Sequence, residues 1–382
     1  MPPRFILSTN QAKNQSYCDY GFHLILTNPT PEVIYDQFPI LLEQGISTVK
    51  IYMSYEERRL SDDNILKVMV QTRKLGMTTL IHAENWDMIS FIIDDLKKKE
   101  LTDPYFHAVS RPPIVEDEAS YRAICLSELL DTPILIVHVS TNGATRNIRN
   151  AQTKMLPIMG ETCPQYLYLM SDKLKLPNFE GAKYVCSPPM RDDVKDIQAL
   201  WDGIANGTFQ VVNSDHCPFN YGGEAGKRLG IVNGIAKFTD IPNGLPGIET
   251  RVPLMFQGIN DGKITPQKFV EVTSYNPALL YGFEKKGLIA PGYDADIVIW
   301  YPQEAFQGLT ITNGMLNHDI DYTPYEGIRI GNWPRYTILR GEVVWDRDNQ
   351  GLTAKGPSGK FVKRTGNKLR GPRGQFSSEW HP

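Results

Sequence analysis

The 382-residue sequence lacks the features of three broad classes of protein. No apolar run approaches the ~20 residues that a membrane-spanning helix requires. The opening, MPPRFILSTNQAKNQ, has too short an apolar stretch for a secretory signal. The formal net charge of -3 provides no overall attraction to nucleic acid or to an anionic membrane. We therefore expect neither a nucleic acid nor a membrane as partner.

Cysteine is also scarce, and its distribution excludes two kinds of stabilising site. The chain has five cysteines, an odd number, and they are widely spaced with no CxxC pair: Cys18, Cys125, Cys163, Cys186 and Cys217. This pattern is typical of reduced thiols in a cytoplasmic protein. It argues against a disulfide framework and against a zinc site built from cysteines.

What the sequence does contain is a repeated unit, a short apolar run followed by a longer amphipathic stretch. The runs are nearly continuous in apolarity and rich in β-branched residues, as strands buried on both faces of a parallel sheet are. We expect six such strands, at residues 21–27, 48–53, 78–83, 133–139, 155–161 and 209–215.

The stretches between these runs carry helix start and stop signals. Thr30 can cap a helix that begins at Pro31 and ends before Gly45. Asp62 begins a second helix, which ends with basic residues before Gly76. Similar apolar spacing predicts helices at 86–100, 115–130, 141–152 and 192–206. Alternating strands and helices predict a parallel α/β fold, either a barrel or an open sheet, over residues 1–285.

The last hundred residues have a different texture. Residues 286–350 contain strand-like runs separated by Gly and Pro turns, with no helix between adjacent runs, and predict a small β appendage. Residues 351–382 form a basic tail, with seven basic and no acidic residues between Lys355 and Arg373. We expect this tail to be mobile or to follow the surface, because basic tails of this kind are common in proteins that bind no nucleic acid.

Four polar residues interrupt the apolar runs or end them, and these residues suggest chemistry. They are Lys50, His82, His138 and Asp215. Each has an ordinary alternative: a histidine can be a hydrogen-bonded structural residue, a lysine can pair with a carboxylate, and an aspartate can cap a helix. Their recurrence near the carboxyl ends of successive strands is harder to explain in this way, because barrels place their active sites there.

Imidazole and carboxylate side chains on separate strands can converge on a divalent metal, typically zinc. An ammonium cannot be a ligand, but desolvation lowers the pKa of a lysine and exposes a neutral amine. That amine can react with carbon dioxide to give a carbamate, whose oxygens can bridge two metals. The four residues therefore suggest a metal-dependent hydrolase in which Asp215 moves a proton.

Nine collinear segments resemble the dihydropyrimidinase and hydantoinase branch of the amidohydrolase superfamily. They run in order from about Ser16 to Asp346, nearly the whole chain: SYCDYGFH, VKIYMSY, IHAEN, IVHVST, ETCPQYL, YVCSPPMR, SDHCPF, NGLPGIETR and NPALLYGFEKKGLIAPGYDADIVIW. The resemblance implies a TIM-type (β/α) barrel joined to a small β-sandwich. It also implies an enzyme that opens cyclic amides such as dihydropyrimidines, hydantoins and related imides.

The resemblance assigns roles to individual residues. Lys50 matches the carboxylated lysine that bridges two zinc ions, and His82 and His138 match the histidines of the second metal. Asp215 matches the catalytic aspartate that also binds the first metal. Three further residues match the substrate site: Tyr55, which steadies the oxyanion, and Ser187 and Asn243, whose main-chain groups bind the amide or imide edge.

One departure from the family pattern is clear. The family holds its first metal with an HxH motif after the first barrel strand, and none of the seven histidines of this sequence forms that motif. Eight strands close such a barrel, whereas only six are predicted here. We therefore expect an incomplete barrel that lacks the first two strands, binds one zinc or none with little or no ring opening on its own, and associates, since the family forms tetramers. The alternative is a non-catalytic assembly or scaffold homologue.

Overall fold

A computed structural model describes residues 11–349 and 351–367. Its centre is a parallel six-stranded sheet whose spatial order follows the sequence, from β1 at one edge to β6 at the other. The strands are β1 (Leu24–Ile25), β2 (Thr48–Tyr52), β3 (Thr78–His82), β4 (Ile134–Ile136), β5 (Ile158–Thr162) and β6 (Val211–Val212). Each lies within one of the six predicted runs or overlaps it.

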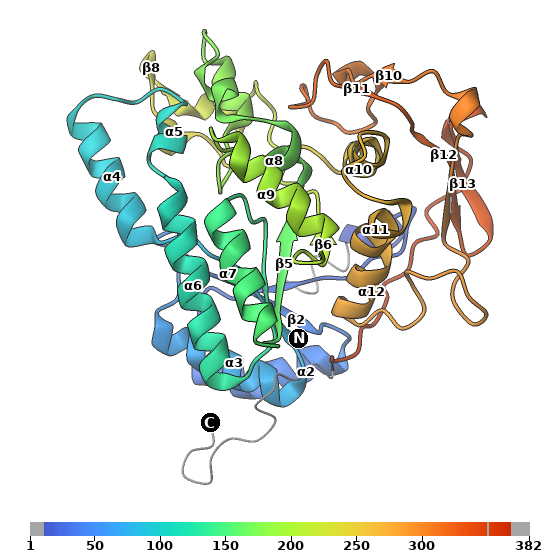
Figure 1. Cartoon of the computed structure of the whole chain (residues 1–382), viewed down its shortest axis with the longest axis horizontal. Coiled ribbons are helices and arrows are strands. Elements are labelled where there is room, and N and C mark those ends of the chain that lie inside the picture. The colour runs from blue at the N-terminus through green and yellow to red at the C-terminus, as the bar shows by residue number, and fades with distance from the viewer. Residues whose placement is uncertain (1–10, 350, 368–382) are drawn as a thin grey trace.

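Helices follow the strands and cover the outside of the sheet (Figure 1). The main helices between successive strands are, in chain order, η1–α2 (Glu32–Glu43), α3 (Asp62–Leu75), α4 (Trp86–Lys98), α5 (Phe106–Val109), α6 (Pro113–Leu130), α7 (Asn142–Thr153) and α9 (Val194–Ala205). The predicted ends are present, because the Thr30 hydroxyl accepts a hydrogen bond from Val33 N and Gly76 ends α3 with φ 71°. Short α8 (Pro164–Tyr168) follows β5, and α10 (Arg251–Asn260), α11 (Pro266–Val270) and α12 (Asn276–Tyr281) follow β6.

The register of the sheet separates two apolar layers. One row of paired residues runs across neighbouring strands, from Ile25 through Lys50, Leu80 and Leu135 to Met159. Leu80, Leu135 and Met159 pack with Val211 and Leu280 in a small inner cluster. Alternate residues of the strands, including Ile51, Ile81 and Ile136, belong to the large cluster that the helices cover. Since side chains alternate along a strand, Lys50 faces the inner layer.

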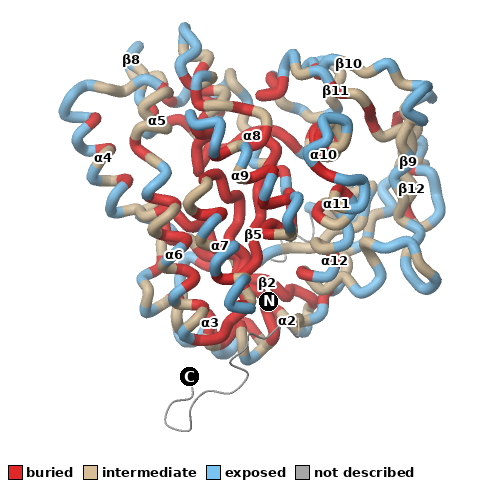
Figure 2. The backbone as a smooth tube through the Cα atoms, in the orientation of Figure 1, coloured by how far each residue is buried: buried red, intermediate tan, exposed pale blue. Residues whose placement is uncertain are grey.

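The burial pattern agrees with this layering. Buried residues concentrate in β5 and the neighbouring strands, while exposed residues lie on the outer faces of the helices and in the C-terminal sheet (Figure 2). At the β1 edge the inner row reaches the surface, where Ile25 is 55% exposed. Among the described residues, no helix has both the length and the apolarity needed to cross a bilayer.

The region after residue 285 contains an antiparallel sheet. Four antiparallel strands pair in the order β14 (Gly351–Leu352), β13 (Glu342–Asp346), β12 (Pro334–Leu339) and β9 (Ile297–Trp300). A groove of about 750 Å³ separates this sheet from α11 and α12, and its walls include Phe269, Ile289 and Trp300. Apolar surface is therefore accessible on this side of the barrel.

The first part of the predicted tail follows the surface of the barrel. Phe361 pairs with Tyr20, Arg364 N donates to Gly45 O at 3.1 Å, and Asn367 N donates to Gly76 O at 2.7 Å. These contacts lie on the segments that precede β1, β2 and β3, which is the end of the sheet opposite the predicted site. The rest of the predicted tail, residues 368–382, lies outside the described residues.

Candidate active site

Lys50 lies in the middle of β2, in the inner row of the sheet, and is only partly buried. Desolvation lowers the pKa of its ammonium, while the carboxylates of Asp215 and Glu161 oppose that change. Two strand ends, β5 and β6, therefore direct their carboxylates toward the lysine of β2. The sheet brings together residues that are more than a hundred positions apart in the sequence.

The two predicted histidines meet at the same end of the sheet. His82 ends β3 two residues after Leu80 and so faces the same inner side. His138 lies just past β4, where strict alternation would turn it outward, but its backbone is left-handed with φ 44°. The ring centroids of the two histidines lie 4.5 Å apart. Both are buried, and desolvation together with the nearby Lys50 holds the pKa of each well below its usual range. Both imidazoles are therefore neutral, as metal ligands must be.

Glu84 fixes the orientation of His82. Its carboxylate is fully buried and lies 2.7 Å from His82 Nε2. A proton on Nε2 that is donated to Glu84 leaves Nδ1 as the free lone pair of the ring. The guanidinium of Arg111 lies 3.9 Å from the other carboxylate oxygen, so the buried charge of Glu84 has a partner.

Asp215 follows β6 and also has a left-handed backbone, with φ 45°. Desolvation raises the pKa of its carboxyl group, and Lys50 lowers it. Glu161, in β5, is buried, and desolvation raises its pKa to about 7. Glu161 is also 3.4 Å from the Tyr281 hydroxyl. Two carboxyl groups with raised pKa values thus lie near one lysine with a lowered pKa. Such clusters of shifted pKa values are typical of active sites.

The predicted substrate-binding residues lie beside the histidines. The ring of Tyr55 is 5.3 Å from the ring of His82, and its backbone is left-handed with φ 66°. Desolvation raises the pKa of its hydroxyl to about 12, and hydrogen bonding to Ser187 and Asn243 moderates that change. Tyr55, Ser187 and Asn243 therefore surround one space, although they come from three distant loops.

A cavity of about 220 Å³ is lined by Asn243 and by residues of α4 that include Trp86. Its walls also include His107, Arg111 and Phe238. The side-chain oxygen of Asn243 is buried without a hydrogen-bond partner. This cavity thus combines apolar walls with a small number of polar groups, as small-molecule sites do.

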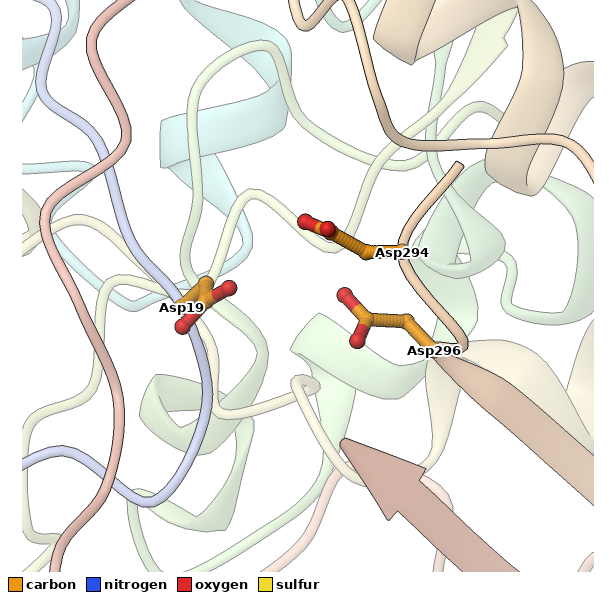
Figure 3. A group of neighbouring side chains, drawn as sticks. All are labelled: Asp19, Asp294 and Asp296. Atoms are coloured by element: carbon orange, nitrogen blue, oxygen red, sulfur yellow. The ribbon is translucent and has the colours of Figure 1, made fainter. Parts of the chain in front are cut away.

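A different group of acidic residues also gathers in the structure (Figure 3). Oxygens of Asp19, Asp294 and Asp296 lie within 4.8 Å of one another. Lys286 Nζ sits among them, at 2.6, 2.8 and 2.5 Å from Asp19, Asp294 and Asp296, and Arg340 also pairs with Asp19. The ammonium occupies the position that a cation would take, so this cluster is an ion-pair network that joins residue 19 to the C-terminal sheet.

The donors at the barrel site fit a metal better. Nδ1 of His138 is buried without a hydrogen-bond partner, which is costly unless something else binds there. Within the described part of the chain, the donor atoms of His82, His138 and Asp215 do not form a set within 4.8 Å of one another.

Sequence reasoning missed three residues that the structure adds to this site. Glu84 is two residues after His82, and a carboxylate so close to a strand-end histidine was a usable signal. Glu161 lies within an apolar run, as Lys50 does, and could have been found by the same argument. Arg111 carries no such signal, because it reaches the site from a helix connection through tertiary contacts alone.

Comparison with known proteins agrees with this geometry. Residues 39–344 match the Amidohydrolase family, whose members are generally metal-dependent. The chain is 38% identical to the D-hydantoinase of Ralstonia pickettii over 355 residues, which cover 92% of this chain and 75% of that protein. It is 40% identical to the D-hydantoinase of Geobacillus stearothermophilus, over 93% of this chain and 74% of the relative.

Solved structures show the same fold. The crystal structure of dihydropyrimidinase from Brevibacillus agri NCHU1002 superposes with a TM-score of 0.90 at 37% identity, covering 96% of this chain and 77% of that one. The expected family and the barrel fold are confirmed, and no comparison favours the non-catalytic alternative. The chain belongs to the amidohydrolase family.

Proposed function

We propose that this chain hydrolyses the C–N bond of small cyclic amides, such as hydantoins or dihydropyrimidines. The observation that carries the proposal is the convergence of Lys50, His82, His138 and Asp215 at the carboxyl end of one parallel sheet, beside Tyr55. The relatives named D-hydantoinase and dihydropyrimidinase support the choice of substrate class.

The chain's own residues would divide the work as follows. His82, His138 and a carbamate on Lys50 would hold one zinc, and Asp215 with that carbamate would contribute to a second. When bound, the metal polarises the ring carbonyl and makes water acidic enough to lose a proton near neutral pH. Since this set supplies only two protein ligands for the second zinc, we expect about one metal or none per chain.

Tyr55 would stabilise the oxyanion. Because burial raises the pKa of its hydroxyl to about 12, that hydroxyl remains protonated at neutral pH and can donate a hydrogen bond to the developing negative charge. Asp215 would accept the proton of the attacking water and deliver it to the leaving nitrogen, as the C–N bond breaks. Its raised pKa makes the protonated form accessible.

The main-chain groups of Ser187 and Asn243 would bind the ring. A cyclic amide presents an N–H beside a C=O, and two backbone groups from different loops can bind the pair together. The family also suggests a homo-oligomer; the exposed Ile25 and the apolar groove beside α11 and α12 supply surface suited to association.

The test is ring opening of hydantoin and dihydrouracil by the purified chain, with zinc and bicarbonate supplied. Asp215→Asn should abolish the turnover that the chain shows while leaving its fold intact. Lys74→Met, which changes an exposed lysine of α3, is the matched control and should behave as the parent. Turnover by Asp215→Asn at the parental rate would refute the proposed role.

A further inference from the structure

Lys227 is a fully buried lysine that the proposed chemistry does not use. It lies in the long connection between β6 and α10, at the start of the 3-10 helix η4 (Lys227–Gly230), and its exposed fraction is 0%. Burying an ammonium is expensive unless it finds strong partners. The partners of Lys227 therefore indicate what the residue is for.

Two backbone carbonyls bind the Lys227 amine. Nζ donates to Val185 O at 2.7 Å and to Pro242 O at 2.6 Å. Val185 lies two residues before Ser187, and Pro242 lies directly before Asn243. The amine thus joins the two loops whose main-chain groups are proposed to bind the substrate ring.

The same two loops are joined by their own backbone. Gly244 N donates to Val185 O at 3.1 Å, so that one carbonyl accepts from both Lys227 and the Asn243 loop. A Cβ on Gly244, whose φ is +141°, would lie 2.3 Å from Cys217 O, which only glycine permits. Cys217 N in turn donates to Leu245 O at 3.1 Å. The segment that carries Asp215 is therefore tied to the same junction.

The segment that carries Lys227 is itself held firmly. Lys227 N donates to Asn220 O at 2.8 Å. The glycine before it has no room for a side chain, because a Cβ on Gly226 would lie 2.1 Å from Gly222 O. Phe219 closes the remaining side, with its ring centroid 5.8 Å from Nζ. A fixed backbone and two fixed acceptors leave the amine little freedom.

We propose that Lys227 is a positioning residue, which sets the separation between the Ser187 and Asn243 backbone groups and so the orientation of the bound ring. The inference rests on the proposed function, because it concerns the same substrate site. Within the described residues, the amine of Lys227 donates to these two carbonyls and to none of the proposed metal ligands, so its loss should disturb substrate binding more than metal binding.

The experiment compares Lys227→Met, which keeps the length of the side chain but removes its donors, with Lys227→Gln, which restores a two-donor group. Lys237→Met, at an exposed position of the same connection, is the control. The Met variant should raise KM for hydantoin about tenfold or more, with a smaller change in kcat and with unchanged zinc content. The Gln variant should recover part of the loss. An unchanged KM, or an equal loss in zinc content, would overturn the proposal.

Amide hydrogen exchange provides a second measurement that needs no turnover. It therefore distinguishes failure of the positioning role from failure of the proposed function. In Lys227→Met, exchange should accelerate at residues 185–187 and 243–245 and remain slow in β2–β5. Exchange that is unchanged in those loops, or that accelerates everywhere alike, would overturn the positioning role. If the parent chain opens neither hydantoin nor dihydrouracil, the proposed function fails, and the exchange result alone decides whether Lys227 fixes the loops.

Discussion

Two lysines of this protein are withdrawn from water in different surroundings. Lys227 is fully buried and donates to two carbonyls, which can only accept hydrogen bonds. Lys50 is partly buried in the middle of β2, near two carboxylates and two neutral histidines. Carbonyl acceptors suit an amine that holds backbone in place, and would repel a carbamate. Carboxylates and imidazoles can bind metals. These neighbours, within reach of solvent, suit an amine that is converted to a carbamate.

The comparison teaches that a lowered pKa does not by itself mark a reactive lysine. Desolvation lowers the pKa of both residues, that of Lys227 to about 7. What separates them is the chemistry of their neighbours. If the interpretation is right, replacing Lys50 removes function without loss of stability, whereas replacing Lys227 costs stability first.

The largest effect should follow Lys50→Met. Removing the proposed bridging group should lower zinc content and reduce ring opening by about two orders of magnitude or more. Because the side chain is replaced by an apolar one of similar length, the free energy of unfolding of the metal-free protein should change by less than about 1 kcal/mol. Metal analysis, a ring-opening assay and denaturant unfolding in chelator measure the three quantities. A strongly destabilised Lys50→Met variant would erase the contrast between the lysines.

Lys227→Met should show the opposite balance. It leaves the buried carbonyls of Val185 and Pro242 without their amine donor, which should lower the free energy of unfolding by about 2 kcal/mol. Denaturant unfolding of the metal-free protein measures this, with Lys237→Met as the control. Equal stability of the parent and Lys227→Met would contradict a structural role for the amine.

A smaller effect is expected at Glu84, which supports the site only through His82. Glu84→Gln keeps the shape of the side chain but weakens the charge-assisted contact of 2.7 Å with His82 Nε2. Zinc affinity should fall about 10- to 100-fold. Glu56→Gln, at an exposed glutamate, should leave it unchanged. If both variants bind zinc like the parent, His82 is not oriented by Glu84.

The last prediction concerns the contribution of Lys227 to the pH dependence of stability. Its pKa is lowered to about 7 in the folded protein from an ordinary value of 10.5, so between these pH values the unfolded chain holds the extra proton. Stability due to this residue therefore rises with pH across that window, by at most about 1.4 kcal/mol per pH unit. The thiols of Cys186 and Cys217 also face the amine and raise its pKa.

The difference in unfolding free energy between the parent and Lys227→Met isolates this contribution at each pH. It should grow from about pH 7 toward pH 10 and remain constant at lower pH. A difference that is independent of pH would mean that the folded lysine keeps its proton throughout.

Much of the fold could be predicted from the sequence because parallel strands and their helices carry strong local patterns. The six strands and most helices appear where apolar runs and caps indicate, and Lys50 and His82 lie on strands whose alternation can be followed by eye. The positions past the strand ends were less accessible. His138 and Asp215 reach the site through left-handed backbone that no residue-type preference predicts.

Tertiary contacts account for what the sequence could not provide. Arg111 and Lys227 lie in irregular connections, and only the folded chain reveals that one reaches Glu84 and the other joins two loops. The basic stretch before residue 368 looks like a solvated tail in sequence, yet Arg364 is buried and donates to Gly45 O and Phe22 O. Composition describes the average environment of a residue, not its partners.

The central claim is that metal binds among Lys50, His82 and His138, and the most direct measurement is anomalous diffraction at the zinc edge from crystals of the zinc-reconstituted chain. The account predicts a peak within about 2.0–2.1 Å of a ring nitrogen of His82 and of His138, beside the Lys50 side chain. A peak only at the Asp19, Asp294 and Asp296 cluster, or none in a chain that still opens hydantoin, would contradict it.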